Sequence, residues 1–229
     1  MKRILCYGDS NTWGFVPSLT GDDRWPEDVR WTGVCQKKLG ADYRILEDGL
    51  NGRTTVWDDF EGPWRNGKDA LGYTLLSQKP IDLLVLSLGV NDLKFVDAIT
   101  AGEGTKKLLQ MILDADAVFN GQRTGIFRHA PKILVLGLVQ LHPDIIKIQP
   151  DTAFCEKYKE SLRLEREQQK VAMELGLPFL PMSRWACASP VDGVHMDAEN
   201  HYNYGNVVAE KIREIFKDKE KNNVSDPNL

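Results

Sequence analysis

Five short apolar segments recur along this chain of 229 residues, and they constrain its fold more than any other feature. Each is rich in Ile, Leu or Val, and they lie at residues 3–7, 43–47, 82–88, 132–138 and 178–180. Segments that are apolar throughout, rather than alternately apolar and polar, are typical of strands covered on both faces. The sequence therefore predicts a parallel sheet of five strands.

Segments with helical spacing lie between these strands. The clearest covers residues 152–175, where apolar side chains recur among charged ones, and Gly176 followed by Pro178 predicts its end. We expect further helices near residues 28–39, 105–119 and 198–217. Alternating strands and helices predict the α/β class, a doubly wound sheet with helices on both faces in three α/β/α layers.

The length suits one large α/β core better than two small ones. We expect a single domain over residues 1–216 and a polar tail over residues 217–229. Residues 55–68 and 119–130 carry Gly, Trp, Asn and Arg without periodicity, which predicts long surface loops. Loops of this length are often functional.

Composition argues against several classes of function. The 29 basic and 33 acidic residues give a formal charge of -4, without a basic footprint for nucleic acid or a polybasic patch for membranes. The apolar run near the amino terminus is too short for a signal peptide, and no segment approaches the roughly 20 apolar residues that span a bilayer. We expect a cytoplasmic protein that acts on a small molecule, with no nucleic-acid or membrane partner.

The four cysteines stand far apart and form no C-x-x-C pair. This spacing suggests neither a zinc site nor a thioredoxin-type motif. We expect the cysteines to be reduced and mostly buried, since free cysteines pack as small hydrophobes. We also expect no metal and no cofactor.

Ser10 has the setting of a nucleophile, because Gly-Asp-Ser directly follows the first predicted strand, at the edge of the sheet where open α/β folds place their chemistry. Near the other end of the chain, Asp192 and His195 are three residues apart. That spacing lets the carboxylate accept the Nδ1 hydrogen and leaves Nε2 for the serine. Together they predict a catalytic triad, although singly Ser10 can be a turn residue and Asp192 a helix cap.

Three groups could stabilise an oxyanion beside that serine. Asn91 follows the third predicted strand, and its carboxamide can donate a hydrogen bond. Gly52 follows the second strand and offers an unobstructed backbone amide, with Gly49 as a competing candidate, and the Ser10 amide is the third donor. Turn chemistry is the alternative explanation for Asn91 and for the glycines.

Other polar residues have simpler interpretations. Asp9 is expected to hold its turn through backbone hydrogen bonds, and Arg53 to fix a loop. His142 follows the fourth strand and could lie near the pocket, but it lacks an obvious partner. His129 and His201 are expected to be structural or exposed.

Four sequence blocks resemble the SGNH, or GDSL, hydrolase family. They are Gly8-Asp9-Ser10, the glycine Gly52, the block with Gly89, Asn91 and Asp92, and the block with Asp192 and His195, and they occur in order over almost the whole chain. Wider stretches are similar to the bacterial arylesterase and acyltransferase branch. The resemblance implies a flavodoxin-like sheet, small acyl esters as substrates and a homo-oligomer.

The pocket is where the chain departs from that branch. Asn11 stands where Leu is common, and residues 139–155 do not match the proline-rich counterpart closely. We expect both to line the pocket, and we expect Asn11, Trp13, Phe15 and Val194 to contact substrate. Exposed aromatic residues between 55 and 64 could mark a subunit contact.

These features predict a serine esterase of acetyl or aryl esters that acts through an acyl-enzyme and can also transfer the acyl group to an alcohol. A carbohydrate acetylesterase is the alternative within the same chemistry. A non-catalytic flavodoxin-like module that binds flavin or phosphate is the alternative from another class, and the lack of a Gly-rich phosphate loop after the first strand argues against it.

Overall fold

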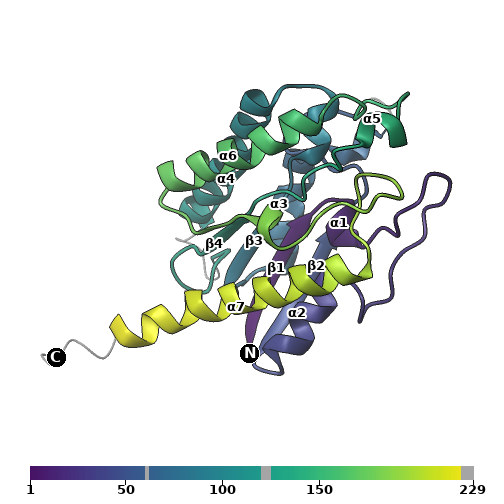
Figure 1. The fold of residues 1–229 in the computed structure, drawn as a ribbon. Helices are drawn as coiled ribbons and strands as arrows, with labels where there is room; N and C mark the ends of the chain where they lie inside the picture. The colour runs from purple at the N-terminus through teal and green to yellow at the C-terminus, as the bar shows by residue number, and fades with distance from the viewer. Residues whose placement is uncertain (60–61, 120–124, 223–229) are drawn as a thin grey trace, which may run out of the picture.

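The computed structural model describes residues 1–59, 62–119 and 125–222 (Figure 1). Its parallel sheet has the strand order β2-β1-β3-β4-β5, which is that of flavodoxin-like sheets. The strands are β1 (Lys2–Gly8), β2 (Tyr43–Gly49), β3 (Leu83–Ser87), β4 (Ile133–Leu136) and β5 (Phe179–Leu180). All five predicted strands are therefore confirmed.

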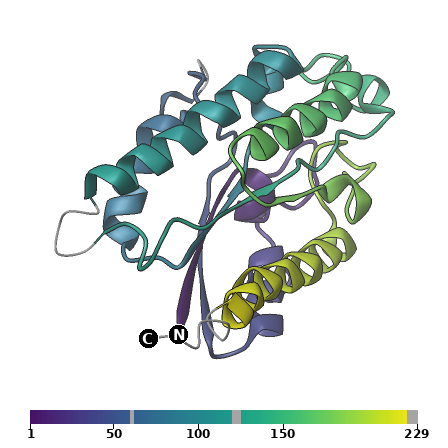
Figure 2. The same ribbon diagram turned by 90° about the vertical axis from the view of Figure 1, so that its left-hand side faces the viewer.

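Helices cover both faces of the sheet, as the predicted three layers require (Figure 2). One face carries α2 (Trp31–Leu39) and α7 (Ala198–Asn222). The other face carries α3 (Gly67–Gln78), α4 (Ala98–Phe119) and α6 (Tyr158–Glu174). Short helical turns complete the chain: α1 (Ser10–Trp13), α5 (Ile145–Ile148), η1 (Pro63–Arg65), η2 (Val90–Lys94) and η3 (Met182–Arg184).

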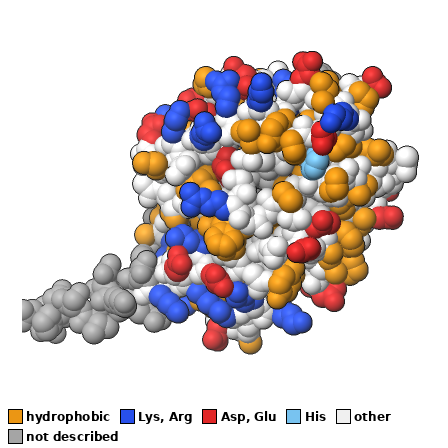
Figure 3. All heavy atoms as spheres, in the orientation of Figure 1, with side chains coloured by type: hydrophobic (Ala, Val, Ile, Leu, Met, Phe, Trp, Pro, Cys, Tyr) orange, Lys and Arg blue, Asp and Glu red, His pale blue; other side chains and the backbone are white. Residues whose placement is uncertain are grey.

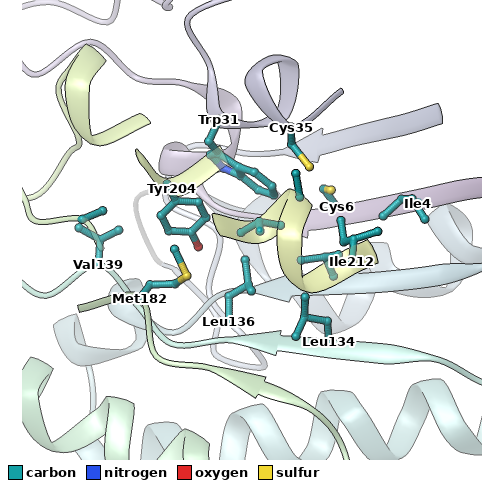
Figure 4. Close-up of a cluster of buried hydrophobic side chains, with 14 of the residues drawn as sticks. Ile4, Cys6, Trp31, Cys35, Leu134, Leu136, Val139, Met182, Tyr204 and Ile212 are labelled. Carbon is teal, nitrogen blue, oxygen red and sulfur yellow. The ribbon is translucent and has the colours of Figure 1, made fainter. Parts of the chain in front are cut away.

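Alternate residues of each central strand enter different cores. In β1, Ile4 and Cys6 pack toward α2 and α7, whereas Leu5 and Tyr7 pack toward α3 and α4. Figure 4 shows the first of these clusters, in which Trp31 of α2 lies beside Tyr204 of α7 with ring centroids 5.1 Å apart. Burial on both faces explains why the strands lack a polar alternation.

Helix α3 was not predicted from the sequence. It buries the side chains of Leu71 and Leu75 but leaves Tyr73 exposed, so its apolar stripe is too narrow to read as an amphipathic helix. The signal that could have revealed its start is Asn66, whose side chain accepts a hydrogen bond from the Lys68 amide in the N-cap position.

Two other helices are longer than expected, and two begin later. Helix α4 starts at Ala98 rather than near residue 105, because Gly102 and Gly104 weaken the sequence signal while allowing close packing. Helix α7 continues to Asn222, into the predicted tail. Helices α2 and α6 begin at Trp31 and Tyr158, later than expected. Gly176 follows the end of α6, as predicted, and has a left-handed φ of 64°.

The two predicted long loops are described only in part. Within residues 55–68 the chain forms η1 and the start of α3, and residues 60–61 lie outside the described part. Residues 120–124 of the second loop also lie outside it. The segment that follows joins the sheet region through a bridge between Ile81 and Phe127.

The register of the strands aligns three chain segments at one edge. Gly8 of β1 pairs with Gly49 of β2 and with Ser87 of β3, so these strands end side by side. The residues that follow each strand therefore emerge at the same carboxyl edge of the sheet. This edge carries the candidate site.

The burial of the cysteines agrees only partly with the expectation from the sequence. Cys6 and Cys35 are buried, but Cys155 is half-buried and Cys187 is exposed, so the prediction of mostly buried cysteines is wrong for half of them.

On the face shown in Figure 3, basic and acidic side chains are interspersed. Among the described residues, no helix combines the length and apolar character needed to cross a membrane.

Candidate active site

Ser10 is the first residue of α1, directly after β1. Asp9 caps this short helix, because its Oδ1 accepts a hydrogen bond from the Asn11 amide at 3.0 Å. Glycine is required at position 8, since a Cβ there would lie 2.0 Å from Thr12 Oγ1 and 2.9 Å from the Ser87 carbonyl oxygen. The tight turn thus fixes Ser10 at the carboxyl edge of the sheet, and the predicted role of Asp9 is confirmed.

Ser10, His195 and Asp192 form a continuous chain of hydrogen bonds. His195 Nε2 lies 2.9 Å from Ser10 Oγ, and His195 Nδ1 lies 2.7 Å from Asp192 Oδ2. Phe15 stacks on the imidazole with ring centroids 4.2 Å apart, so the ring has little freedom to rotate. The arrangement matches the spacing argument made from the sequence.

Asp192 is held as a carboxylate. Its Oδ1 accepts from the amides of Val194 and His195, and its Oδ2 also accepts from the Ser18 amide at 3.1 Å. Burial alone would raise the pKa of Asp192, but the hydrogen bonds from His195 and Val194 and the charge of the imidazole outweigh it, so this pKa lies below the usual value. The ionised carboxylate can therefore orient and stabilise a protonated imidazole.

The loop that carries His195 is tied to the helix that carries Ser10. Asn11 Oδ1 accepts from the Met196 amide at 3.0 Å, and Asn11 Nδ2 donates to the Val194 carbonyl at 3.4 Å. Asn11 is buried by these contacts and is not among the residues that line the pocket. Its side chain connects the two parts of the site, in contrast to the expectation that it lines the pocket.

The candidate oxyanion donors meet beside Ser10. Asn91 lies in η2 after β3, and Gly52 follows β2 with a φ of 76°; both line the same pocket as Ser10. Asn91 Nδ2 also donates to the Arg53 carbonyl at 3.2 Å, which orients the carboxamide. Gly49 instead packs under α1, where a Cβ would lie 2.1 Å from the Trp13 amide nitrogen. The geometry thus favours Gly52 over Gly49.

Arg53 fixes the loop after β2, as expected. Its Nη1 donates to the carbonyls of Gly8 and Asp48, its Nη2 donates to Asp48 Oδ1 at 2.8 Å, and its guanidinium stacks on the Tyr7 ring. This buried side chain therefore joins the ends of β1 and β2 beneath the site.

Asp92 joins the Asn91 and Gly52 segments in a similar way. Its carboxylate accepts from the amide of Thr55 at 2.8 Å and from the hydroxyl of Thr55 at 2.5 Å. Burial raises the pKa of Asp92 to about 7, although these hydrogen bonds act against the shift. Burial likewise raises the pKa of Asp9 to about 6, against the hydrogen bond from Asn11 and the charge of His195.

The pocket at this edge has a volume of about 320 Å³. Phe15, Leu19, Phe154 and Val194 supply apolar lining, and the polar lining includes Asn51, Arg65 and Gln149. Phe15 and Val194 therefore lie in the pocket, as expected. Phe154 belongs to the segment 139–155, which was also expected to line the pocket. Trp13 is not among the lining residues; its ring lies under the Arg24 guanidinium.

The remaining histidines lie away from this pocket. His142 Nδ1 accepts from the Asp144 amide, and its backbone amide donates to the Gly193 carbonyl at 2.9 Å, in the loop that carries Asp192 and His195. His129 is exposed. His201 is fully buried; its Nδ1 accepts from the Trp31 amide, and burial lowers its pKa to about 3.

Sequence reasoning missed Arg65 and Leu19 as lining residues, whereas Gln149 and Phe154 lie in the segment 139–155 that was expected to line the pocket. Arg65 and Leu19 lie in segments without periodicity, so the sequence offered no pattern to place them. The only signal was indirect, because the long loop that contains Arg65 was expected to be functional.

Comparison with known proteins places this geometry in a family. The model of the GDSL-like lipase/acylhydrolase family matches residues 6–204. A solved structure of the aryl esterase of M. smegmatis is similar with 32% identity and a TM-score of 0.85, over 93% of this chain and 99% of that one. A carbohydrate acetylesterase from Sinorhizobium meliloti is similar with 30% identity and a TM-score of 0.84, over 94% and 100% of the two chains.

A more distant structure shares the fold alone. It is a member of the lipolytic protein G-D-S-L family from Veillonella parvula, with 13% identity and a TM-score of 0.60, over 92% of this chain and 97% of that one. No curated protein matches the sequence. The family match and the esterase neighbours together show that the chain belongs to the GDSL-like lipase/acylhydrolase family and is a carboxylic ester hydrolase with the SGNH hydrolase fold.

Proposed function

We propose that the protein hydrolyses small acyl esters through an acyl-enzyme on Ser10, with His195 as the base and Asp192 as the residue that orients it. The observation that carries the proposal is the continuous hydrogen-bond chain from Asp192 through His195 to Ser10, which opens on a pocket that also contains Gly52 and Asn91. Nucleophile, base and oxyanion donors are the parts that acyl transfer requires.

In the acylation step, His195 Nε2 takes the proton of Ser10 as Oγ attacks the ester carbonyl. The oxyanion accepts hydrogen bonds from the amides of Ser10 and Gly52 and from Asn91 Nδ2. Loss of one such donor typically lowers the rate by about 10² to 10³. The protonated imidazole then gives its proton to the leaving alcohol, and the acyl group remains on Ser10.

In the second step, His195 removes a proton from a water molecule, which attacks the acyl-enzyme and releases the acid. An alcohol that enters in place of water would take the acyl group, so acyl transfer can compete with hydrolysis on the same machinery. The similarity to an aryl esterase and to a carbohydrate acetylesterase supports aryl and acetyl esters as the substrates.

The direct test is a Ser10→Ala variant assayed with p-nitrophenyl acetate. We expect hydrolysis to fall by at least 10³-fold, because the nucleophile is lost, and we expect a fluorophosphonate to label the parent protein once per chain and the variant not at all. Ser77→Ala is the control, since Ser77 is exposed on α3 and donates to its own helix. Hydrolysis by Ser10→Ala at the parent rate would refute the mechanism, and absence of labelling in the parent would support the non-catalytic alternative.

A carbohydrate acetylesterase remains a second candidate, because the pocket has polar lining at Asn51 and Gln149 and one neighbour has that activity. Acetylated xylo-oligosaccharides and aryl acetates, compared by kcat/KM, separate the two candidates. We expect p-nitrophenyl esters from acetate to octanoate to be hydrolysed more slowly as the acyl chain lengthens, because the pocket is small. Activity that rises toward octanoate would contradict a small-acyl enzyme.

A further inference from the structure

Arg65 is the charged side chain of the pocket that the proposed mechanism does not use. The other two charged or titratable side chains in the lining are Asp192 and His195, which are bonded to each other. Arg65 has one third of its side chain exposed, so part of the guanidinium is open to the cavity.

The position of Arg65 is fixed from two sides. A Cβ on Gly52 would lie 2.7 Å from Arg65 Cδ and Nε, and a Cβ on Gly62 would lie 2.5 Å from the same two atoms, so the side chain passes over two glycines. Its backbone carbonyl accepts from the Thr54 amide at 3.0 Å. The guanidinium is therefore held against the backbone of Gly52, which is also the candidate oxyanion donor.

Arg65 shares its carboxylate partner with a second cation. Asp59 Oδ2 accepts both from Arg65 Nη1 at 3.1 Å and from Lys94 Nζ at 2.7 Å. One buried carboxylate thus serves two cations, and this group of three residues carries a net positive charge. A guanidinium has five N–H donors in a planar fork. Within the described part of the chain the Arg65 guanidinium donates through Nη1, so Nε and Nη2 are able to bind an acceptor in the pocket.

We infer that the pocket selects esters that carry a carboxylate group, and that Arg65 binds this carboxylate. The inference rests on the proposed esterase function. A carboxylate matches the guanidinium fork with two parallel hydrogen bonds, and the short apolar part of such an ester can contact Phe15 and Phe154. The carboxylate can belong to the acyl part or to the alcohol part of the ester, and the two sources need separate substrates.

The test compares anionic and neutral esters of similar size. For the acyl part, monomethyl succinate is compared with methyl butyrate; for the alcohol part, acetoxyacetate is compared with its methyl ester. We expect the parent enzyme to favour the anionic ester by at least tenfold in kcat/KM in one of the two pairs. Arg65→Gln should lower that ratio at least tenfold, and Arg65→Lys should give an intermediate ratio because it keeps the charge but loses the fork.

Two further measurements separate binding from folding. Succinate should inhibit the parent competitively, and Arg65→Gln should raise its inhibition constant at least tenfold. Arg163→Gln is the matched control, since Arg163 is an exposed arginine that pairs with Glu160 on α6, and it should leave the ratio and the inhibition unchanged.

Several results would overturn the inference. One is a parent enzyme with the same kcat/KM for the anionic and the neutral ester in both pairs. Another is an Arg65→Gln variant in which kcat/KM falls equally for anionic and neutral esters, so that their ratio does not change. If neutral esters are hydrolysed and Ser10 is labelled, such a result removes the carboxylate inference alone. If no ester is hydrolysed and Ser10 is not labelled, the proposed function itself fails.

Discussion

At the scale of single residues, the site depends on side chains outside the pocket lining. Asn11 is the clearest case, because it bonds to the backbone on both sides of His195, at Val194 and Met196. The sequence placed Ser10, Asp192 and His195 by motif and spacing. It could not reveal the contacts of Asn11, since its partners lie more than 180 residues away along the chain.

We therefore expect Asn11→Ala to reduce kcat with p-nitrophenyl acetate by about 10- to 100-fold, because a small displacement of the base is costly. The Met196 amide would also lose its acceptor, and a buried unpaired donor costs about 1–3 kcal/mol in the free energy of unfolding. Esterase kinetics and urea unfolding measure both effects. Asn206→Ala, at an asparagine of α7 that donates to its own helix, is the control, and equal activity of the two variants would contradict the role of Asn11.

Asp92 predicts a pH dependence of stability. Its folded pKa of about 7 lies above the ordinary value of 3.8, so the stability that it contributes is present at low pH and is lost as pH rises through the folded pKa. Asp92→Asn should remove this loss, because the amide can accept from the Thr55 amide and donate to its hydroxyl.

Urea unfolding of the parent and of Asp92→Asn at pH 5 and pH 8 measures the effect. One pKa unit corresponds to about 1.4 kcal/mol. We expect the variant to gain more than this amount in free energy of unfolding relative to the parent between the two pH values. A difference that does not change with pH would show that Asp92 keeps the same protonation in the folded and unfolded chains.

At the scale of helices and strands, close packing decides what the sequence could reveal. The strands were evident because burial on both faces makes them apolar throughout. Helix α3 was not, because it buries few residues, and the start of α4 was hidden by glycines that allow contact with Thr55 and Glu167. Composition and periodicity report burial, but they do not report how closely two backbones approach.

Two helical glycines test this distinction. A Cβ on Gly205 of α7 would lie 2.5 Å from the Trp31 carbonyl oxygen of α2, whereas a Cβ on Gly72 of α3 would meet nothing within 4 Å. We expect Gly205→Ala to destabilise the protein by about 1–3 kcal/mol through overpacking. Gly72→Ala should stabilise it by about 0.5–1 kcal/mol through helix propensity. Thermal and urea unfolding compare the two, and equal effects would contradict close packing of α2 on α7.

At the scale of the whole molecule, we propose that the chain assembles with copies of itself. The exposed aromatic residues support this, since Trp64, next to the lining residue Arg65, is 84% exposed and Tyr73 of α3 is 81% exposed. Large exposed aromatics are typical of interfaces. A subunit contact there would also close the pocket from outside and favour short acyl chains.

Light scattering coupled to size-exclusion chromatography tests the assembly. We expect a mass that is a multiple of the 25.9 kDa chain, and a lower mass for Trp64→Glu because a charge would enter the interface. Met173→Glu, at an exposed methionine on α6, should leave the mass unchanged. A single-chain mass at micromolar concentration would rule out the assembly.

The hydrogen bond between Ser10 and His195 joins residues 185 positions apart. During synthesis the serine leaves the ribosome 185 residues ahead of its base, so a chain made only to the middle of that interval carries the hydroxyl without the imidazole. Reactivity of Ser10 toward a fluorophosphonate should therefore appear only after the segment with His195 has folded against it. Pulsed labelling of refolding or nascent chains would record when the carboxyl-terminal part docks onto the amino-terminal half.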